Sequence, residues 1–222
     1  MAAYRRRVLR NLFDDSPTPH IAHPPKTHRR DFYVATDGSY YSDGTGGLGV
    51  VIESNDGGRV ARLAVPDVVP DNNVAEYRAL HLGLDVLAAR TPSNVRVGVL
   101  LDHDDLAANV NRATIATRTP DSEPPHPVRI PRTTANHWRG IRARVAGFAE
   151  VRAARIDSDE NPAHPLANTP EQYEHVHGES DRRQSKNGDR SPGDGVYPPP
   201  SRADRQRSEL ADRGTFDESA SD

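Results

Sequence analysis

The chain is organised around one stretch, Phe32-Tyr-Val-Ala-Thr-Asp-Gly-Ser-Tyr40. Its side chains alternate in character up to Asp37, and this alternation predicts a half-buried β-strand over residues 31–37. A second apolar run at 47–54 follows a loop rich in glycine, so the two runs predict a hairpin. The carboxylate of Asp37 is therefore expected near the middle of a sheet, where a rigid backbone can hold a metal ion or a substrate precisely.

The rest of the ordered region alternates strand and helix patterns in the order β-β-β-α-β-α-α-β-α. An Asn-Asp-Gly-Gly turn leads into the third strand, because asparagine and glycine tolerate positive φ. The predicted strands are 31–37, 47–54, 59–65, 95–101 and 151–156. The predicted helices are 72–88, 106–111, 136–148 and a last one from Asn161, with Asn72 or Asn73 capping the first. A long polar loop is expected at 117–131.

Composition limits what this chain can be. The 222 residues are 34% hydrophobic with a mean hydropathy of -0.79, and the apolar residues concentrate between 32 and 167. With no cysteine, disulfides, thiolate metal sites and cysteine nucleophiles are excluded. No apolar run is long enough to span a membrane. The net charge of -3 gives no global basic field of the kind that attracts nucleic acid.

Three regions follow from this distribution. Residues 1–30 carry four prolines and scattered basic side chains, and we expect a disordered basic arm there. Residues 31–170 are expected to form one domain. Residues 171–222 have little apolar content and are expected to be a disordered polar tail. We expect the protein to be a cytoplasmic monomer that does not associate with membranes, because the basic start lacks an apolar signal core.

Three acids lie at points of this pattern from which they can converge. Asp37 lies in the first strand, Glu76 in the first turn of the first long helix and Asp102 at the end of the fourth strand. Converging carboxylates repel one another unless a cation lies among them, and hard oxygen ligands suit Mg²⁺ or Mn²⁺. Each acid also has an ordinary explanation: a turn aspartate at Asp37, compensation of the helix dipole at Glu76 and a helix N-cap at Asp102.

The motifs, taken together, resemble type 1 ribonuclease H over residues 31–170. The resemblance rests on Asp37-Gly-Ser39, on Gly46-Gly-Leu-Gly49, on Asn72-Asn-Val-Ala-Glu-Tyr-Arg-Ala-Leu80 and on the apolar strand that ends at Asp102. Asp159-Glu-Asn-Pro-Ala-His-Pro-Leu-Ala167 is similar to the closing motif of that family. Four such pieces in the right order, with the right elements between them, are a specific signal.

This resemblance implies an α/β fold with a five-stranded mixed sheet, its three antiparallel strands first, flanked by helices. It implies a metal-dependent endonuclease that hydrolyses the RNA strand of RNA–DNA hybrids with two Mg²⁺ or Mn²⁺ ions. The implied metal ligands and catalytic residues are Asp37, Glu76, Asp102 and His164. The implied substrate-binding residues are Gly38, Ser39 and Asn73, with Asn73 at the minor groove or a 2′-OH of the RNA. The 117–131 loop lacks a basic handle, as in compact members.

Two residues depart from the family pattern. His164 stands where the family usually has its fourth aspartate, so either His164 or one of Asp157 and Asp159 completes the site. His103 follows Asp102 in place of the usual serine. Two other functions stay open: a nucleic-acid-binding domain without catalysis, and a nuclease of the same fold with another nucleic-acid substrate.

Overall fold

The structure is a computed structural model, and it describes residues 7–18, 29–118 and 129–173. Five strands form one sheet in the order β3-β2-β1-β4-β5. They are β1 (Phe32–Tyr40), β2 (Thr45–Ser54), β3 (Arg59–Val68), β4 (Arg96–Leu101) and β5 (Glu150–Arg155). The first three pair antiparallel, whereas β4 is parallel to β1 and β5 is parallel to β4. The predicted five-stranded mixed sheet, with three antiparallel strands first, is confirmed.

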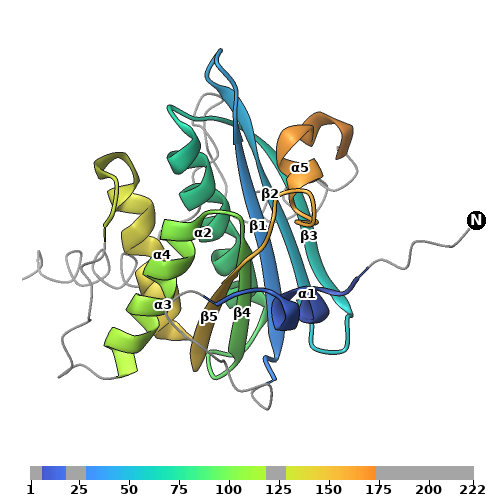
Figure 1. Ribbon diagram of the computed structural model, residues 1–222, viewed down its shortest axis with the longest axis vertical. Coiled ribbons are helices and arrows are strands. Elements are labelled where there is room, and N and C mark those ends of the chain that lie inside the picture. Colours follow the sequence, from blue (N-terminus) through green and yellow to red (C-terminus); the bar gives the residue numbers. More distant parts are fainter. Residues whose placement is uncertain (1–6, 19–28, 119–128, 174–222) are drawn as a thin grey trace, which may run out of the picture.

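Helices cover both faces of the sheet (Figure 1). The main core lies under α2 (Asn72–Arg90), α3 (Asp104–Arg118) and α4 (Ala135–Gly147), where Leu80, Leu106 and Ile141 are fully buried. The second, smaller core lies on the opposite face, under α1 (Leu9–Asp15) and α5 (His164–Asn168). Short 3₁₀ turns, η1 (Arg132–Thr134) and η2 (Pro170–Tyr173), precede α4 and follow α5.

Because both faces are covered, β1 differs from the half-buried strand that alternation predicts. Residues 33–39 of β1 are all buried. Tyr33 and Ala35 belong to the smaller core and Val34 to the larger one. The polar side chains at Thr36 and Asp37 are therefore buried as well, at 0% and 2% exposure. A buried carboxylate in a central strand needs a partner or a function.

Helix α1 is a second difference, because residues 1–30 were expected to be a disordered arm. Leu9, Leu12 and Phe13 are buried against the sheet, and the Phe13 and Tyr33 rings meet edge to face at 5.6 Å. The Leu9 amide also donates to the buried carboxylate of Glu53. Apolar contact, rather than composition, orders this segment. The expected tail begins at 171 and lies almost wholly outside the described residues, and the three-part division otherwise stays a prediction.

Two smaller predictions are corrected at helix ends. The α2 cap is Asp71, whose carboxylate accepts from the Val74 amide, and not Asn72 or Asn73. Helix α3 runs to Arg118, seven residues past its predicted end, so part of the expected 117–131 loop is helical. Residues 119–128 of that loop lie outside the described part of the chain. No helix among the described residues is long and apolar enough to cross a membrane.

Candidate metal centre and its surroundings

Four predicted site residues come from four elements that meet at one end of β1. Asp37 lies in β1, and Asp102 follows β4 directly. Because β1 and β4 are parallel neighbours, their carboxyl ends open on the same edge of the sheet. Glu76 lies near the start of α2 and His164 is the first residue of α5, so the two faces of the sheet each contribute one side chain.

Glycine at position 38 allows the close approach that brings Glu76 to Asp37. A Cβ atom at Gly38 would overlap the backbone of Ala75 and Glu76. The start of α2 therefore lies directly on β1, and the Gly38 amide donates to the Glu76 carboxylate. Gly38, predicted to bind substrate, has this packing role in the structure.

The geometry brings Asp37, Asp102 and His164 together. One ligand atom from each of the three lies within 4.8 Å of the others. Nδ1 of His164 lies 3.2 Å from Oδ2 of Asp37. Asp157 and Asp159 are exposed, and Asp157 accepts a hydrogen bond from Arg155. Of the three residues proposed to complete the site, His164 is the one that the structure places in the cluster.

Burial and repulsion from neighbouring carboxylates raise the pKa values of Asp37 and Glu76. The pKa of Asp37 is raised to about 8, first by burial and then by the charge and shared hydrogen bonding of Asp102. The pKa of Glu76 is also raised well above its usual value, first by burial and then by Asp102 and Asp37. Burial and the neighbouring carboxylates thus oppose the ionisation of Asp37 and Glu76.

A divalent cation fits this set of donors. Oε2 of Glu76 is buried and has no hydrogen-bond donor among the described residues, which is costly for a carboxylate unless something else neutralises it. Carboxylate oxygens are the preferred ligands of Mg²⁺, and one imidazole nitrogen is compatible with Mn²⁺. An ion among these residues would remove the repulsion and restore ordinary ionisation.

Two side chains that the motifs did not single out hold the site in place. The amide nitrogen of Asn168 lies 2.7 Å from Nε2 of His164, one helical turn further along α5. The hydroxyl of Ser158 donates to Oδ2 of Asp102 at 2.7 Å. The spacing of four between His164 and Asn168 was a usable signal. Ser158 had none, because its reach depends on the shape of the β5–α5 loop.

The N-cap explanation of Asp102 does not hold, because His103 caps α3 instead. The Leu106 amide donates to Nδ1 of His103 at 3.2 Å, and the Ala107 amide donates to the His103 carbonyl. The carboxylate of Asp102 is thereby left for the site.

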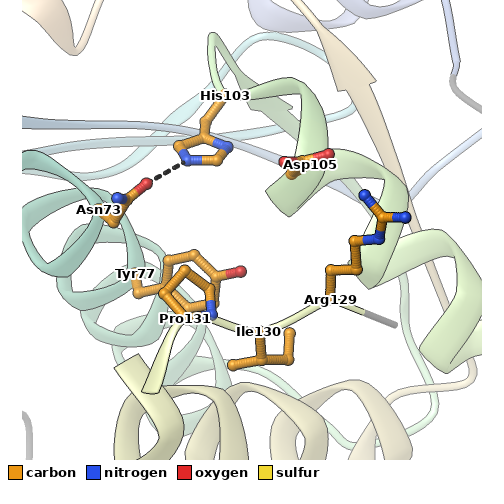
Figure 2. Close-up of a pocket in the computed structure, with 7 residues that line it drawn as sticks. All are labelled: Asn73, Tyr77, His103, Asp105, Arg129, Ile130 and Pro131. Atoms are coloured by element: carbon orange, nitrogen blue, oxygen red, sulfur yellow. Dashed lines mark hydrogen bonds between the residues drawn. The ribbon is translucent and has the colours of Figure 1, made fainter. Parts of the chain in front are cut away.

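The predicted substrate residues are placed differently from one another. Asn73 is exposed at the start of α2 and lines a cavity of about 450 Å³ with Tyr77, His103 and Arg129 (Figure 2). Ser39 is buried and its hydroxyl donates to the Ala167 carbonyl at 2.7 Å. The assignment of Ser39 to substrate binding stays a prediction that the geometry does not favour.

No protein-family model matches this chain, and no curated protein matches it. Solved structures that match this chain include ribonuclease H domains. One is the N-terminal ribonuclease H domain of a Mycobacterium tuberculosis protein, solved as a fusion with maltose-binding protein. It is 21% identical, with a TM-score of 0.48, and the match covers 61% of this chain and 95% of that chain.

Two ribonuclease H1 structures are similar as well. That of the archaeon Halobacterium salinarum is 21% identical with a TM-score of 0.46, over 64% of this chain and 98% of that one. A metagenomic compost enzyme bound to an RNA/DNA hybrid is 19% identical with a TM-score of 0.48, over 64% and 99%. Such likeness concerns the fold alone. The strand order and pairing described above are those of the five-stranded mixed sheet that the motif resemblance implies.

Proposed function

We propose that this protein is a metal-dependent endonuclease that hydrolyses the RNA strand of RNA–DNA hybrids. The observation that carries the proposal is the meeting of Asp37, Glu76, Asp102 and His164 with one buried carboxylate oxygen left without a donor. The hybrid as substrate comes from the motif resemblance, and one similar solved structure is a ribonuclease H1 in complex with such a hybrid. The catalytic unit is the proposed domain at 31–170, with α1 packed on it.

Asp37, Glu76, Asp102 and His164 would hold Mg²⁺ or Mn²⁺, with two ions proposed. When bound, such ions supply a water of lowered pKa and neutralise the charge that develops on the oxygens of the attacked phosphate. Asp37 is the central ligand, because its carboxylate faces both Asp102 and His164. Its burial keeps bulk water out, which strengthens every electrostatic interaction there.

The chain's own groups prepare the site for this chemistry. Ser158 donates to Oδ2 of Asp102 and so restrains the position of that carboxylate. Asn168 orients the His164 ring through Nε2. His164 is partly exposed, and its Nδ1 lies 3.2 Å from Oδ2 of Asp37.

Cleavage of a labelled RNA–DNA hybrid in Mg²⁺ and in Mn²⁺ tests the proposal, with RNA–RNA and DNA–DNA duplexes as controls. We expect hybrid cleavage that Asp102→Asn lowers by about a thousandfold, because the change removes an anionic ligand worth several kcal/mol of charge stabilisation. Asp159→Asn is the matched control, since Asp159 is an exposed acid of the neighbouring loop outside the cluster. It is expected to cleave as the unmodified protein does.

Three other outcomes would contradict the proposal. Hybrid binding without cleavage in either metal would favour a nucleic-acid-binding domain. Cleavage of another duplex in preference to the hybrid would favour a different nuclease of this fold. Loss of activity in Asp159→Asn would show that the loop acid, and not His164, completes the site.

A further inference from the structure

His103 lines the cavity of Figure 2 and is next in sequence to Asp102 of the candidate metal centre. Its Nε2 lies 2.9 Å from Oδ1 of Asn73, across the gap between the starts of α2 and α3. The ring of Tyr77 meets the imidazole edge to face, with ring centres 6.2 Å apart. With the Leu106 amide on Nδ1, the His103 ring has three contacts.

The bonding of His103 fixes its tautomer. A backbone N–H can only donate, so Nδ1 accepts from the Leu106 amide with its lone pair. An imidazole that accepts at Nδ1 is neutral and carries its proton on Nε2. Nε2 therefore donates to Asn73, and only the amide oxygen of Asn73 can accept. The orientation of the Asn73 amide follows from the helix cap of α3.

Because its oxygen faces His103, Asn73 presents its NH₂ group to the exterior. That group is a double donor with no accepting function. In the minor groove every base pair offers purine N3 or pyrimidine O2 as acceptors, and RNA adds the 2′-oxygen. A fixed donor suits all of these sites and does not distinguish one base pair from another.

We propose that His103 is a positioning residue that fixes Asn73 as a hydrogen-bond donor for minor-groove acceptors of the hybrid, independently of base sequence. This inference rests on the proposed function for its substrate. An Asn73 amide that is free to turn would present its oxygen half of the time, opposite an acceptor. His103 would thereby improve substrate binding while taking no part in the chemistry at the metal ions.

The variant His103→Ser tests this role, because serine still offers an acceptor for the Leu106 amide but is too short to reach Asn73. We expect KM for the hybrid to rise about five- to tenfold with kcat within about twofold, which is the scale of one neutral hydrogen bond. Asn73→Ala should behave the same way. The double variant should be no worse than either single one, since both act through the same bond.

Thr117→Ala, at the far end of α3, is the control for helix stability and should leave both constants unchanged. Unchanged KM and kcat in His103→Ser would show that the ring only caps the helix, and this would overturn the inference. Additive effects in the double variant would overturn it too, because the two residues would then act separately.

A second measurement does not depend on cleavage. The ¹⁵N shifts of the His103 imidazole in the full chain report which ring nitrogen carries the proton. Protonation at Nε2 is expected, and protonation at Nδ1 would overturn the inference even if the protein cleaves hybrids. If the unmodified protein neither binds nor cleaves hybrids, the proposed function fails and the substrate part of the inference is overturned with it, while the ¹⁵N result still decides the His103–Asn73 bond.

Discussion

Two of the regions in which the described part of this molecule buries charged side chains do so in opposite ways. Around α2 the acids are matched by arginines: Arg144 of α4 bonds Asp85 of α2, and Arg78 of α2 bonds Asp67 of β3 at 2.8 Å. In the candidate metal centre the buried acids lie against one another. The pKa values of Asp37 and Glu76 are raised there, first by burial and then by the neighbouring carboxylates.

The difference separates a structural network from a prepared binding site. A network that satisfies its own charges needs nothing further, and it holds the helices in register. A cluster that repels itself is unstable alone, and it persists only because the surrounding sheet and helices fix it. A bound cation would lower these raised pKa values and would give the buried oxygen of Glu76 a partner.

Breaking the ion pair between Asp85 and Arg144 should lower the stability of the folded protein without impairing the candidate metal centre. Asp85→Ala leaves Arg144 buried and unpaired, and we expect a loss of about 3–5 kcal/mol in the free energy of unfolding. Replacing both partners with apolar residues should cost much less, because no charge is then stranded. Denaturant unfolding measures this. A loss of cleavage per folded molecule in Asp85→Ala would contradict the separation of the two regions.

In metal-free buffer the free energy of unfolding should fall as pH rises, because burial and the neighbouring carboxylates disfavour the ionised form of Asp37. Asp37 has a folded pKa of about 8 against an ordinary value of 3.8, so between these values the folded state keeps a proton that the unfolded state has lost. Stability is then highest at the acidic end and is lost as pH approaches 8. We expect wild type to lose about 2–3 kcal/mol more than Asp37→Asn between pH 5 and 7.5.

Thermal unfolding across this pH range, with and without Mg²⁺, measures the effect. Saturating Mg²⁺ should flatten the wild-type curve, because the bound ion favours the ionised carboxylates. Equal slopes in wild type and Asp37→Asn would show that Asp37 is not destabilised by its neighbours.

The sequence sufficed for the sheet and three of the acids for a physical reason. Strand and helix periods are local, and they locate the strand that holds Asp37, the helix that holds Glu76 and the strand that Asp102 follows. Helix α1 could not be predicted in the same way. Its buried residues are Leu9, Leu12 and Phe13. They are ordered by packing on a sheet face that consists of residues later in the sequence. Composition averaged over residues 1–30 conceals this contact.

The choice between His164 and the loop acids was also beyond the sequence. It depends on how the loop from 157 to 161 folds, and that loop is fixed by the Ser158 hydroxyl on Asp102 and by Asn161, which donates to the Thr36 carbonyl at 3.0 Å. Contacts that span more than fifty positions leave no periodic trace. The pairing of His103 with Asn73, thirty positions apart, is of the same kind.

Replacing the histidine ligand should change metal preference more than fold. Nitrogen ligands suit Mn²⁺ better than Mg²⁺, which prefers oxygen. We therefore expect His164→Asp to lower the ratio of cleavage rates in Mn²⁺ and Mg²⁺ by roughly tenfold. Paired assays in the two metals measure the ratio, with Asp159→Asn as control. An unchanged ratio with full activity would mean that His164 does not touch the metal.

The smallest effect should come from Ser158, which supports the site and contributes no ligand. Ser158→Ala removes one hydrogen bond to Asp102, so we expect Mg²⁺ binding to weaken about fivefold, or about 1 kcal/mol. Ser54→Ala removes a similar serine–aspartate bond in the 54–58 turn and is the matched control. Calorimetric titration with Mg²⁺ compares the two. If both variants bind as wild type does, Asp102 is held by the sheet alone and the loop contributes nothing to the metal centre.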